Sequence, residues 1–471
     1  MVEGNHCHPG RLDIRSDYTH LGRNCETGLE RRPGPRDGDG VRPMLWLYRL
    51  FFLPALLLAA PFYLRRMLRR GGYRAGFSQR FGAVPALPAA RPGVTRIWLQ
   101  AVSVGELLAI GPLLRRLAEG GGTEVYLTTT TSTGYTLARE KYAACTIGIG
   151  YFPLDWPLFS RRAWRKIAPD LVLLMEGEVW PEHLHQATRR GVPAVLVNGR
   201  LSDRTFRRLR RLRALVGGFY RGLVRILPSS EQDAQRYREL GVPPEQLCVT
   251  GNLKFDVTIP PLDTWTRAML RRELGLPDNQ LVVLGSSTWP GEELALLRLL
   301  ERARRDGTVC QLLLVPRHAE RRAEIAALLE EHPLTWHLRS RGQAVGQVDV
   351  CIADTTGELQ QLTQVADLVF VGKSLPPNEG GQTPIEAAAL GKPLMFGPAM
   401  SNFRPATESL LLAGAAVRLD DEVELVDQGL ALLRDEKRRA AMAAAAGRWH
   451  QANQGAVERT LRELAPWLRK K

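Results

Sequence analysis

The sequence predicts an α/β protein with two doubly wound domains. Short apolar runs of strand length alternate with amphipathic segments from Val94 onward, as in parallel β-α units. Residues 251–265, GNLKFDVTIPPLDTW, interrupt this alternation with a proline pair, and a second series of apolar runs follows them. At 471 residues the chain is also too long for one core. Two α/β domains joined by a proline-containing linker are therefore expected.

The N-terminal residues precede both domains. Residues 1–43 are rich in Gly, Arg, Asp and Pro and carry almost no apolar periodicity, so we expect a disordered tail. The character of the chain changes abruptly at Met44, which is a candidate for the true start.

Residues 44–70 predict a membrane anchor helix. The apolar segment approaches the roughly 20 residues that a spanning helix needs, and Trp46 and Tyr63 lie near its ends. An arginine cluster follows, which by the positive-inside rule places the rest of the chain on the cytoplasmic side. No convincing signal-peptide cleavage site is present. The pattern does not distinguish a spanning helix from an interfacial one, and a buried core helix is the alternative.

The first domain, residues 71–258, is expected to contain a buried sheet. The clearest helix pattern runs from Gly105 to Leu117, with its leucines and isoleucine toward one side. Pro112 lies inside this pattern and argues against a straight helix. The predicted strands lie near residues 96–104, 123–130, 170–176, 193–198 and 224–229.

The second domain, residues 259–471, repeats the pattern. Ligands of doubly wound sheets bind at the carboxyl ends of the strands, so two such domains imply a cleft between two sheets. The helical pattern around Ala456–Leu464 is a candidate to cross back to the first domain. The predicted strands are 280–287, 311–318, 348–354, 366–374 and 392–398.

The formal net charge of +15 has two explanations. It indicates an anionic partner, or it reflects a high-GC genome whose codon usage favours arginine over lysine. Arginine makes planar, forked contacts with phosphates and carboxylates. Nucleic acid is not the expected partner, because the sequence has no zinc-finger or RNA-recognition signature. The six cysteines form no C-x-x-C pair, so a reducing compartment is expected. The arginine-rich blocks are 65–70, 161–166 and 204–213.

Charged residues follow several predicted strands, and each has an ordinary explanation beside a functional one. Glu106 stands where strand 96–104 passes into a helix, and a carboxylate there is ordinarily a dipole partner, which makes it a weaker base. Arg317 follows an apolar strand and either forms a structural salt bridge or binds phosphate. Lys254 lies in a turn between two apolar residues, where a surface lysine would also fit.

A glycine-rich turn, residues 380–384, precedes the helix pattern IEAAALG. Such a turn offers unpaired N–H groups to an anion, and Thr383 and Pro384 suit the N-cap and the first helical position. Glu386, just inside this helix, is either a dipole partner or an acceptor for ribose hydroxyls.

A series of short motifs runs through both predicted domains. They are SVGE (103–106), MEGEVWP (175–181), Arg200-Leu201-Ser202, TGNLKFD (250–256), PRHAER (316–321), DTTGEL (354–359) and GGQTPIEAA (380–388) before Asn402-Phe403. In their order and spacing these motifs resemble the 3-deoxy-D-manno-octulosonic acid (Kdo) transferases of lipopolysaccharide assembly. The similarity covers roughly residue 44 to the C-terminus and includes the membrane segment. It implies the GT-B fold, two Rossmann-like domains facing across a cleft, in agreement with the alternation described above.

The resemblance also implies roles for individual residues. Glu106 matches the family's proton acceptor, and Glu176 and Lys254 match positions assigned to transition-state stabilisation. No metal ion and no cofactor are implied, and the sequence shows no DxD-type acid pair placed to hold Mg²⁺. The segments that hold the cytidine monophosphate (CMP) part of the donor match Pro316, Arg317, Thr356, Gly357, Glu358, Thr383, Pro384, Ile385 and Glu386.

The chain departs from the family pattern in three places. The family usually has GGHNPLE, and here Gln382 and Thr383 replace the His and the Asn. It usually has STHEGEE, and here Trp289 and Pro290 replace a His and a Glu. A histidine commonly precedes the SVGE motif, where this chain has Gln100. These replacements concern the contacts that would hold the donor substrate, whereas the Glu, Lys and Arg residues of the motifs are retained.

The implied function is inverting transfer of Kdo from CMP-Kdo to a lipid A precursor, lipid IVA, with Glu106 as general base. It belongs to lipopolysaccharide biosynthesis at the cytoplasmic face of the inner membrane. A phosphorylated acceptor at a bilayer surface suits both the anchor and the arginine blocks. The alternative is another GT-B transferase or epimerase that uses a UDP-sugar. A membrane-tethered binding protein with a degenerate site is a third candidate, although the acids and bases of the motifs are retained.

Overall fold

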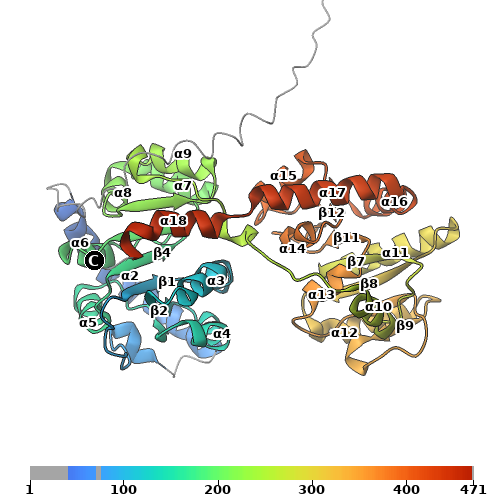
Figure 1. The fold of residues 1–471 in the computed structure, drawn as a ribbon, viewed down its shortest axis with the longest axis horizontal. Coiled ribbons are helices and arrows are strands. Elements are labelled where there is room, and N and C mark those ends of the chain that lie inside the picture. Colours follow the sequence, from blue (N-terminus) through green and yellow to red (C-terminus); the bar gives the residue numbers. More distant parts are fainter. Residues whose placement is uncertain (1–40, 71–75, 469–471) are drawn as a thin grey trace, which may run out of the picture. The chain divides into compact units, whose positions relative to one another are not determined.

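A computed structural model describes residues 41–70 and 76–468. Residues 1–40 of the predicted tail therefore lie outside the described residues. The described residues form two compact units (Figure 1). The first contains those up to Asp256 together with Gly455 onward, and the second is Val257–Gln454. The predicted second domain, 259–471, is therefore too long at its C-terminal end, because the segment from Gly455 belongs to the first unit.

The first unit is built on a six-stranded sheet with strand order β3-β2-β1-β4-β5-β6, and every pairing is parallel. Strand β3 was not predicted, because its sequence, GIGY, carries almost no apolar pattern. Its Gly150 leaves room for the hydroxyl end of Tyr126 on β2. The strands are β1 (Thr95–Gln100), β2 (Thr123–Thr129), β3 (Gly148–Tyr151), β4 (Leu171–Met175), β5 (Ala194–Gly199) and β6 (Arg225–Pro228).

Helices cover both faces of this sheet, because successive strand residues point to opposite sides and both sides are apolar. Ile97 and Leu99 belong to one core, and Trp98 between them belongs to the other. The helices are α3 (Val104–Glu119), α4 (Ser132–Tyr142), α5 (Pro157–Ile167), α6 (Pro181–Arg189), α7 (Asp203–Arg211), α8 (Arg213–Tyr220), α9 (Glu231–Glu239) and α18 (Ala456–Leu468). Short 3-10 helices are η2 (Phe77–Phe81), η3 (Ala143–Cys145), η4 (Pro244–Gln246) and η5 (Leu253–Phe255).

The C-terminal helix α18 packs in the first unit, and Figure 1 draws it in dark red among green and blue elements. Val457 and Leu464 are buried in the core that contains Ile97. Arg225 at the start of β6 pairs with Glu463 at 2.7 Å. The amphipathic pattern that suggested a return to the first domain therefore corresponds to a docked helix.

The second unit contains a seven-stranded sheet with strand order β13-β12-β11-β7-β8-β10-β9, again entirely parallel. Strands β9 and β13 were not predicted, because three-residue strands at the sheet edges give no periodic signal. The strands are β7 (Leu281–Thr288), β8 (Cys310–Pro316), β9 (Trp336–Leu338), β10 (Val350–Ile352), β11 (Leu368–Val371), β12 (Leu394–Phe396) and β13 (Ala416–Arg418).

The second unit has its own core, which gathers residues from the sheet and from several helices, including α11 and α16. Both units are therefore α/β structures of the Rossmann-like type. The helices are α10 (Thr264–Glu273), α11 (Glu292–Arg305), α12 (Arg322–Glu330), α13 (Leu359–Gln364), α14 (Ile385–Ala389), α15 (Arg404–Leu412), α16 (Glu422–Arg434) and α17 (Glu436–Asn453), with 3-10 helices η6 (Ala319–Arg321) and η7 (Arg339–Arg341).

The N-terminal helix α2 (Val41–Arg70) begins at Val41 rather than at residue 44. Among the described residues it is the one helix long and apolar enough to cross a membrane, over Met44–Arg65. Its first turns contact the first unit, since Tyr48 Oη donates to Asp155 Oδ2 at 2.9 Å and Arg49 pairs with Glu182 at 2.7 Å. It is not a buried core helix, because large apolar side chains are exposed along it: Trp46, Leu50, Phe51, Leu57, Leu58 and Phe62.

Candidate active site

Glu106 lies in the first turn of α3, beyond the carboxyl end of β1. Ser103 is the N-cap, and its Oγ accepts a hydrogen bond from Glu106 N at 3.3 Å. The Glu106 carboxylate accepts in return from Val102 N at 2.8 Å and from Ser103 Oγ at 3.1 Å. This is a variant of the capping box, which the S-x-x-E spacing of SVGE encodes locally, with the backbone N–H of Val102 in place of that of the N-cap residue. The motif therefore both starts the helix and fixes the orientation of the carboxylate.

The environment of Glu106 decides whether its carboxylate can act as a base. Its pKa is raised to about 7, chiefly by burial and further by the charges of Glu176 and Glu178, although hydrogen bonds from Val102 and Ser103 oppose the shift. A helix N-terminus alone would lower this pKa, so burial outweighs the position at the helix start. A carboxyl group that titrates near neutral pH is suited to general-base catalysis.

The structure brings Glu176 and Lys254 together as an ion pair. Lys254 Nζ donates to Glu176 Oε1 at 2.9 Å, and an Arg200 nitrogen lies 3.8 Å from the same oxygen. Glu176 directly follows β4 and has a φ of 53°, a strained conformation for a residue with a side chain. Burial and the charge of Glu176 raise the pKa of the neighbouring Glu178 to about 7. Three carboxylates thus share one electrostatic environment.

Two residues without a predicted role, Asn198 and Asp256, hold the loop that carries Lys254. Asn198, fully buried at the end of β5, accepts a hydrogen bond from Leu253 N through Oδ1 at 3.0 Å. Asp256 accepts from Gly455 N at 2.7 Å, which ties the loop to the start of α18. The acid of the LKFD motif was visible in the sequence, but its partner lies at the other end of the chain.

In the second unit, the predicted donor-binding residues follow the adjacent strands β8 and β10, and strand β11 on the other side of β7. Pro316 ends β8 and Arg317 follows it, with its backbone N–H donating to Thr288 O of the adjacent strand at 3.1 Å. The Arg317 side chain is exposed and has no acidic partner in the part of the chain that the structure describes. The alternative of a structural salt bridge is therefore not supported within residues 41–70 and 76–468.

The segment Thr356-Gly357-Glu358 follows β10, the neighbour of β8. Thr356 and Gly357 are exposed, and Gly357 has a φ of 89°, which a residue with a side chain rarely adopts. The Glu358 carboxylate already pairs with Arg339 at 3.3 Å. Thr356 and the adjoining backbone are thus more available to a ligand than the Glu358 side chain.

The segment Thr383–Glu386 lies in the connection after β11. Helix α14 begins at Ile385, so Pro384 is the N-cap, and the predicted assignment of Thr383 to that position is wrong by one residue. Thr383 Oγ1 still accepts a hydrogen bond from Ile385 N at 3.3 Å. Glu386 accepts from Gln360 Nε2 at 2.9 Å, which links this segment to α13. Pro384 and Ile385 are buried, so they offer a ligand mainly backbone groups.

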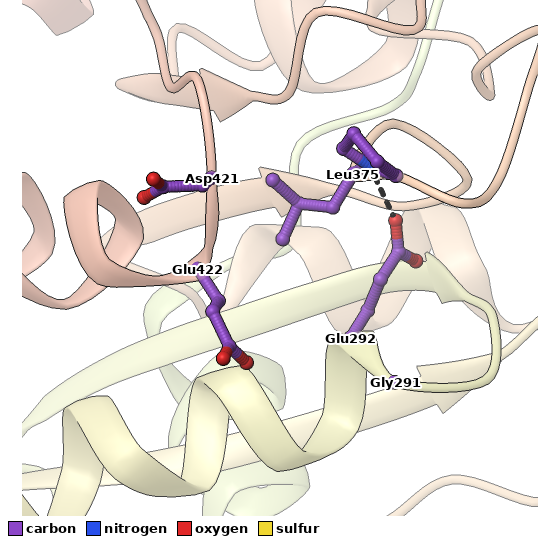
Figure 2. A pocket seen from close by; sticks show the side chains of 6 residues that line it. Gly291, Glu292, Leu375, Asp421 and Glu422 are labelled. Carbon is purple, nitrogen blue, oxygen red and sulfur yellow. Dashed lines mark hydrogen bonds between the residues drawn. The ribbon is translucent and has the colours of Figure 1, made fainter.

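Glu292 organises the backbone between these segments. Its buried carboxylate accepts hydrogen bonds from the backbone N–H groups of Trp289, Lys373, Ser374 and Leu375 at 2.8–3.1 Å. Figure 2 shows the bond to Leu375 beside a cavity of about 280 Å³. Asp421 and Glu422 also line this cavity, which makes it unfavourable for a phosphate. The Glu292 carboxylate therefore holds together the loop that follows β7 and the loop that follows β11. We do not expect it to contact the ligand.

Residues 41–70 and 76–468 hold no cluster of three or more His, Cys, Asp or Glu side chains suited to a metal ion.

Comparison with known proteins agrees with these features. A family model described as 3-deoxy-D-manno-octulosonic-acid transferase (kdotransferase) matches residues 75–257. A 3-deoxy-D-manno-octulosonic acid transferase of Bordetella pertussis is 36% identical over 445 residues, which cover 91% of this chain and 97% of the relative. One from Haemophilus influenzae is 28% identical and covers 90% of this chain and 99% of the relative.

Solved structures show the fold. A UDP-GlcNAc 2-epimerase from Neisseria meningitidis, bound to UDP-GlcNAc, superposes with a TM-score of 0.54 over 78% of this chain and 100% of that one. The sequence identity is 14%, so this likeness concerns the architecture alone. It identifies a GT-B-like fold with two parallel Rossmann-like sheets, in agreement with the predicted fold class.

Proposed function

The chain belongs to the 3-deoxy-D-manno-octulosonic acid (Kdo) transferase family, and on that basis we propose that it transfers Kdo from CMP-Kdo to a hydroxyl of lipid IVA, with inversion at the anomeric carbon. The observation that carries the proposal is the group of Glu106, Glu176 and Lys254 at the carboxyl edge of the first sheet. A buried carboxylate with a pKa near 7 lies in the same electrostatic environment as a lysine–glutamate pair.

In this mechanism Glu106 takes the proton of the acceptor hydroxyl while its oxygen forms a bond to the anomeric carbon. The bond from that carbon to the phosphate of CMP breaks, and CMP leaves with the electron pair. Lys254 stabilises the negative charge of the donor carboxylate or of the departing phosphate. Glu176 orients Lys254 through the 2.9 Å ion pair. Each step uses only groups of the chain and the two substrates.

The second unit would hold the donor. Arg317, which has no acidic partner among the described residues, suits the phosphate, and the exposed Thr356 together with the backbone of the Thr383–Glu386 segment suits the nucleoside. Arginine and backbone N–H groups supply the positive charge and donors that such a phosphate needs.

The surface of the first unit supports the proposed acceptor and location. Helix α2 exposes a row of large apolar side chains, and the arginines of α7 are exposed as well. Apolar and cationic groups of this kind favour an anionic bilayer surface, at about 1 kcal/mol per basic residue. We therefore place the enzyme at the cytoplasmic face of the inner membrane, where a phosphorylated glycolipid would be the acceptor.

Two measurements on one preparation of the full chain test the proposal. Mass spectrometry of the product formed from CMP-Kdo and lipid IVA should show the mass of the acceptor increased by Kdo. CMP, but not UDP, should raise the melting temperature. An increase with UDP alone would favour the alternative of a UDP-sugar enzyme, and no product with any donor would favour a binding protein.

A further inference from the structure

Lys373 occupies an unusual backbone position in the second unit. It follows β11 with a φ of 58°, a left-handed conformation that glycine adopts without strain and lysine does not. Its N–H donates to Glu292 Oε2 at 2.8 Å, and its carbonyl accepts from Gly381 N at 3.0 Å. The backbone is thus held from both sides, which fixes the direction of the side chain. Strained residues of this kind cluster at functional sites.

The Lys373 side chain rests on an aromatic ring instead of an acid. Its Nζ lies 4.6 Å from the centre of the Trp289 ring, a cation–π contact. Within the described ranges 41–70 and 76–468, Lys373 forms no ion pair with a carboxylate. Trp289 also presents a buried Nε1–H for which the described residues supply no acceptor. Two neighbouring donors therefore have no oxygen acceptor among the residues that the structure describes.

These donors stand among the segments proposed to hold the donor substrate. Trp289 follows β7, which lies between β11 and β8 in the sheet. The Trp289 ring meets the His318 ring edge-on at 5.4 Å, directly after Arg317. On the other side, the Lys373 carbonyl is bonded to the Gly381 backbone, two residues before Thr383. Lys373 thus connects two of the candidate segments at the edge where doubly wound sheets bind ligands.

We propose that Lys373, oriented by Trp289, is a further donor-binding residue whose ammonium group contacts an oxyanion of the nucleotide sugar. The oxyanion is either the phosphate of the CMP part or the carboxylate of the sugar. The inference rests on the proposed function, since it takes CMP-Kdo as the donor. A purely structural lysine would leave the left-handed conformation unexplained, because glycine at this position would keep both backbone hydrogen bonds without strain.

The test uses the full chain and three variants. Lys373→Met removes the charge and keeps a long side chain, and Lys373→Gly removes the charge and relieves the backbone. Lys437→Met, at an exposed position on α17, is the matched control. Isothermal titration measures CMP binding, and steady-state transfer measures the KM for CMP-Kdo. A lost charge-assisted contact should weaken donor binding about tenfold in both Lys373 variants, whereas the control should match the wild type.

The two arms separate the possible oxyanions. Weaker CMP binding assigns Lys373 to the phosphate, whereas unchanged CMP binding with a higher KM for CMP-Kdo assigns it to the sugar carboxylate. Unchanged values in both arms overturn the inference. Lys373→Gly should also melt at a higher temperature than the wild type, so that its loss of binding cannot come from unfolding. Wild-type protein that binds no CMP would refute the proposed function itself, and the inference with it.

Discussion

The role of Glu106 yields the sharpest prediction, because its capping and catalytic roles can be separated by substitution. Glu106→Gln keeps an oxygen for the hydrogen bond from Val102 N and a polar group near Ser103 Oγ, so the capping box can persist. It removes the only group that can accept the proton of the acceptor hydroxyl in the proposed mechanism. We expect kcat to fall by about 10²–10⁴-fold, which corresponds to roughly 3–5 kcal/mol of lost transition-state stabilisation.

The same substitution should stabilise the folded protein at neutral and alkaline pH. The pKa of Glu106 is raised from 4.5 to about 7, so the folded state holds the proton more tightly than the unfolded state does. The resulting stabilisation is complete below the unfolded pKa and is lost as the pH rises through about 7. Since one pKa unit corresponds to about 1.4 kcal/mol, the ionised carboxylate costs roughly 3 kcal/mol at pH 8. Glutamine does not ionise, so Glu106→Gln avoids this cost.

Transfer assays and denaturant unfolding at pH 5 and pH 8 measure both effects. The wild-type kcat/KM should rise with pH and level off above about pH 7, as the base form becomes populated. Ser103→Ala is the matched control, because it removes the cap, at a cost of about 1 kcal/mol, and keeps an ionisable carboxylate that still accepts from Val102 N. Activity of Glu106→Gln within threefold of the wild type (roughly 0.7 kcal/mol) would refute the assignment of the base. Lower stability of that variant at pH 8 would refute the electrostatic reasoning.

Four further substitutions test other parts of the structure. Lys254→Met should lower kcat about 10²–10³-fold with little change in KM, because it removes a contact made in the transition state; a change in KM alone would contradict this role. Arg317→Met should raise the KM for CMP-Kdo about tenfold and leave the melting temperature unchanged, and a drop in melting temperature would indicate a structural role. Asp256→Ala should lower the free energy of unfolding by about 1–3 kcal/mol, because the backbone N–H groups of Gly455 and Val457 lose their acceptor. Denaturant unfolding measures this change, and an unchanged free energy would mean that apolar contacts alone hold α18. Leu58→Glu should weaken cosedimentation with anionic vesicles, since this side chain is 85% exposed on α2, whereas Leu412→Glu, at an 80% exposed site on α15, should not.

The strands that could be predicted from the sequence are those that are buried on both faces. Leu171–Met175 is an uninterrupted apolar run, and such a run has few alternatives to a central parallel strand. Strand Gly148–Tyr151 shows the opposite case. Its glycines are required by the ring of Tyr126 on a neighbouring strand, a contact that leaves no trace in the local pattern.

The candidate site was only partly predictable for a related reason. The motifs identify Glu106, Glu176 and Lys254 as residue types at strand ends, where polar groups of α/β proteins gather. They do not show that Asn198 holds the loop of Lys254, because nothing in its local sequence indicates a buried position that accepts a backbone N–H. Lys373 was likewise not singled out, since its importance lies in a backbone angle and a ring contact.

The sequence by itself determined the two α/β units, the N-terminal apolar helix and the family, because these depend on local periodicity and on short motifs in a given order. Only the tertiary structure decided that the Glu106 carboxylate titrates near pH 7, that Glu176 and Lys254 form a pair, and that the C-terminal helix returns to Asp256. The physical reason is that burial, ion pairing and capping by a distant segment depend on atoms that meet only in the folded chain. Lys254 and Glu176 are separated by 78 positions in the sequence, and Gly455 and Asp256 by 199.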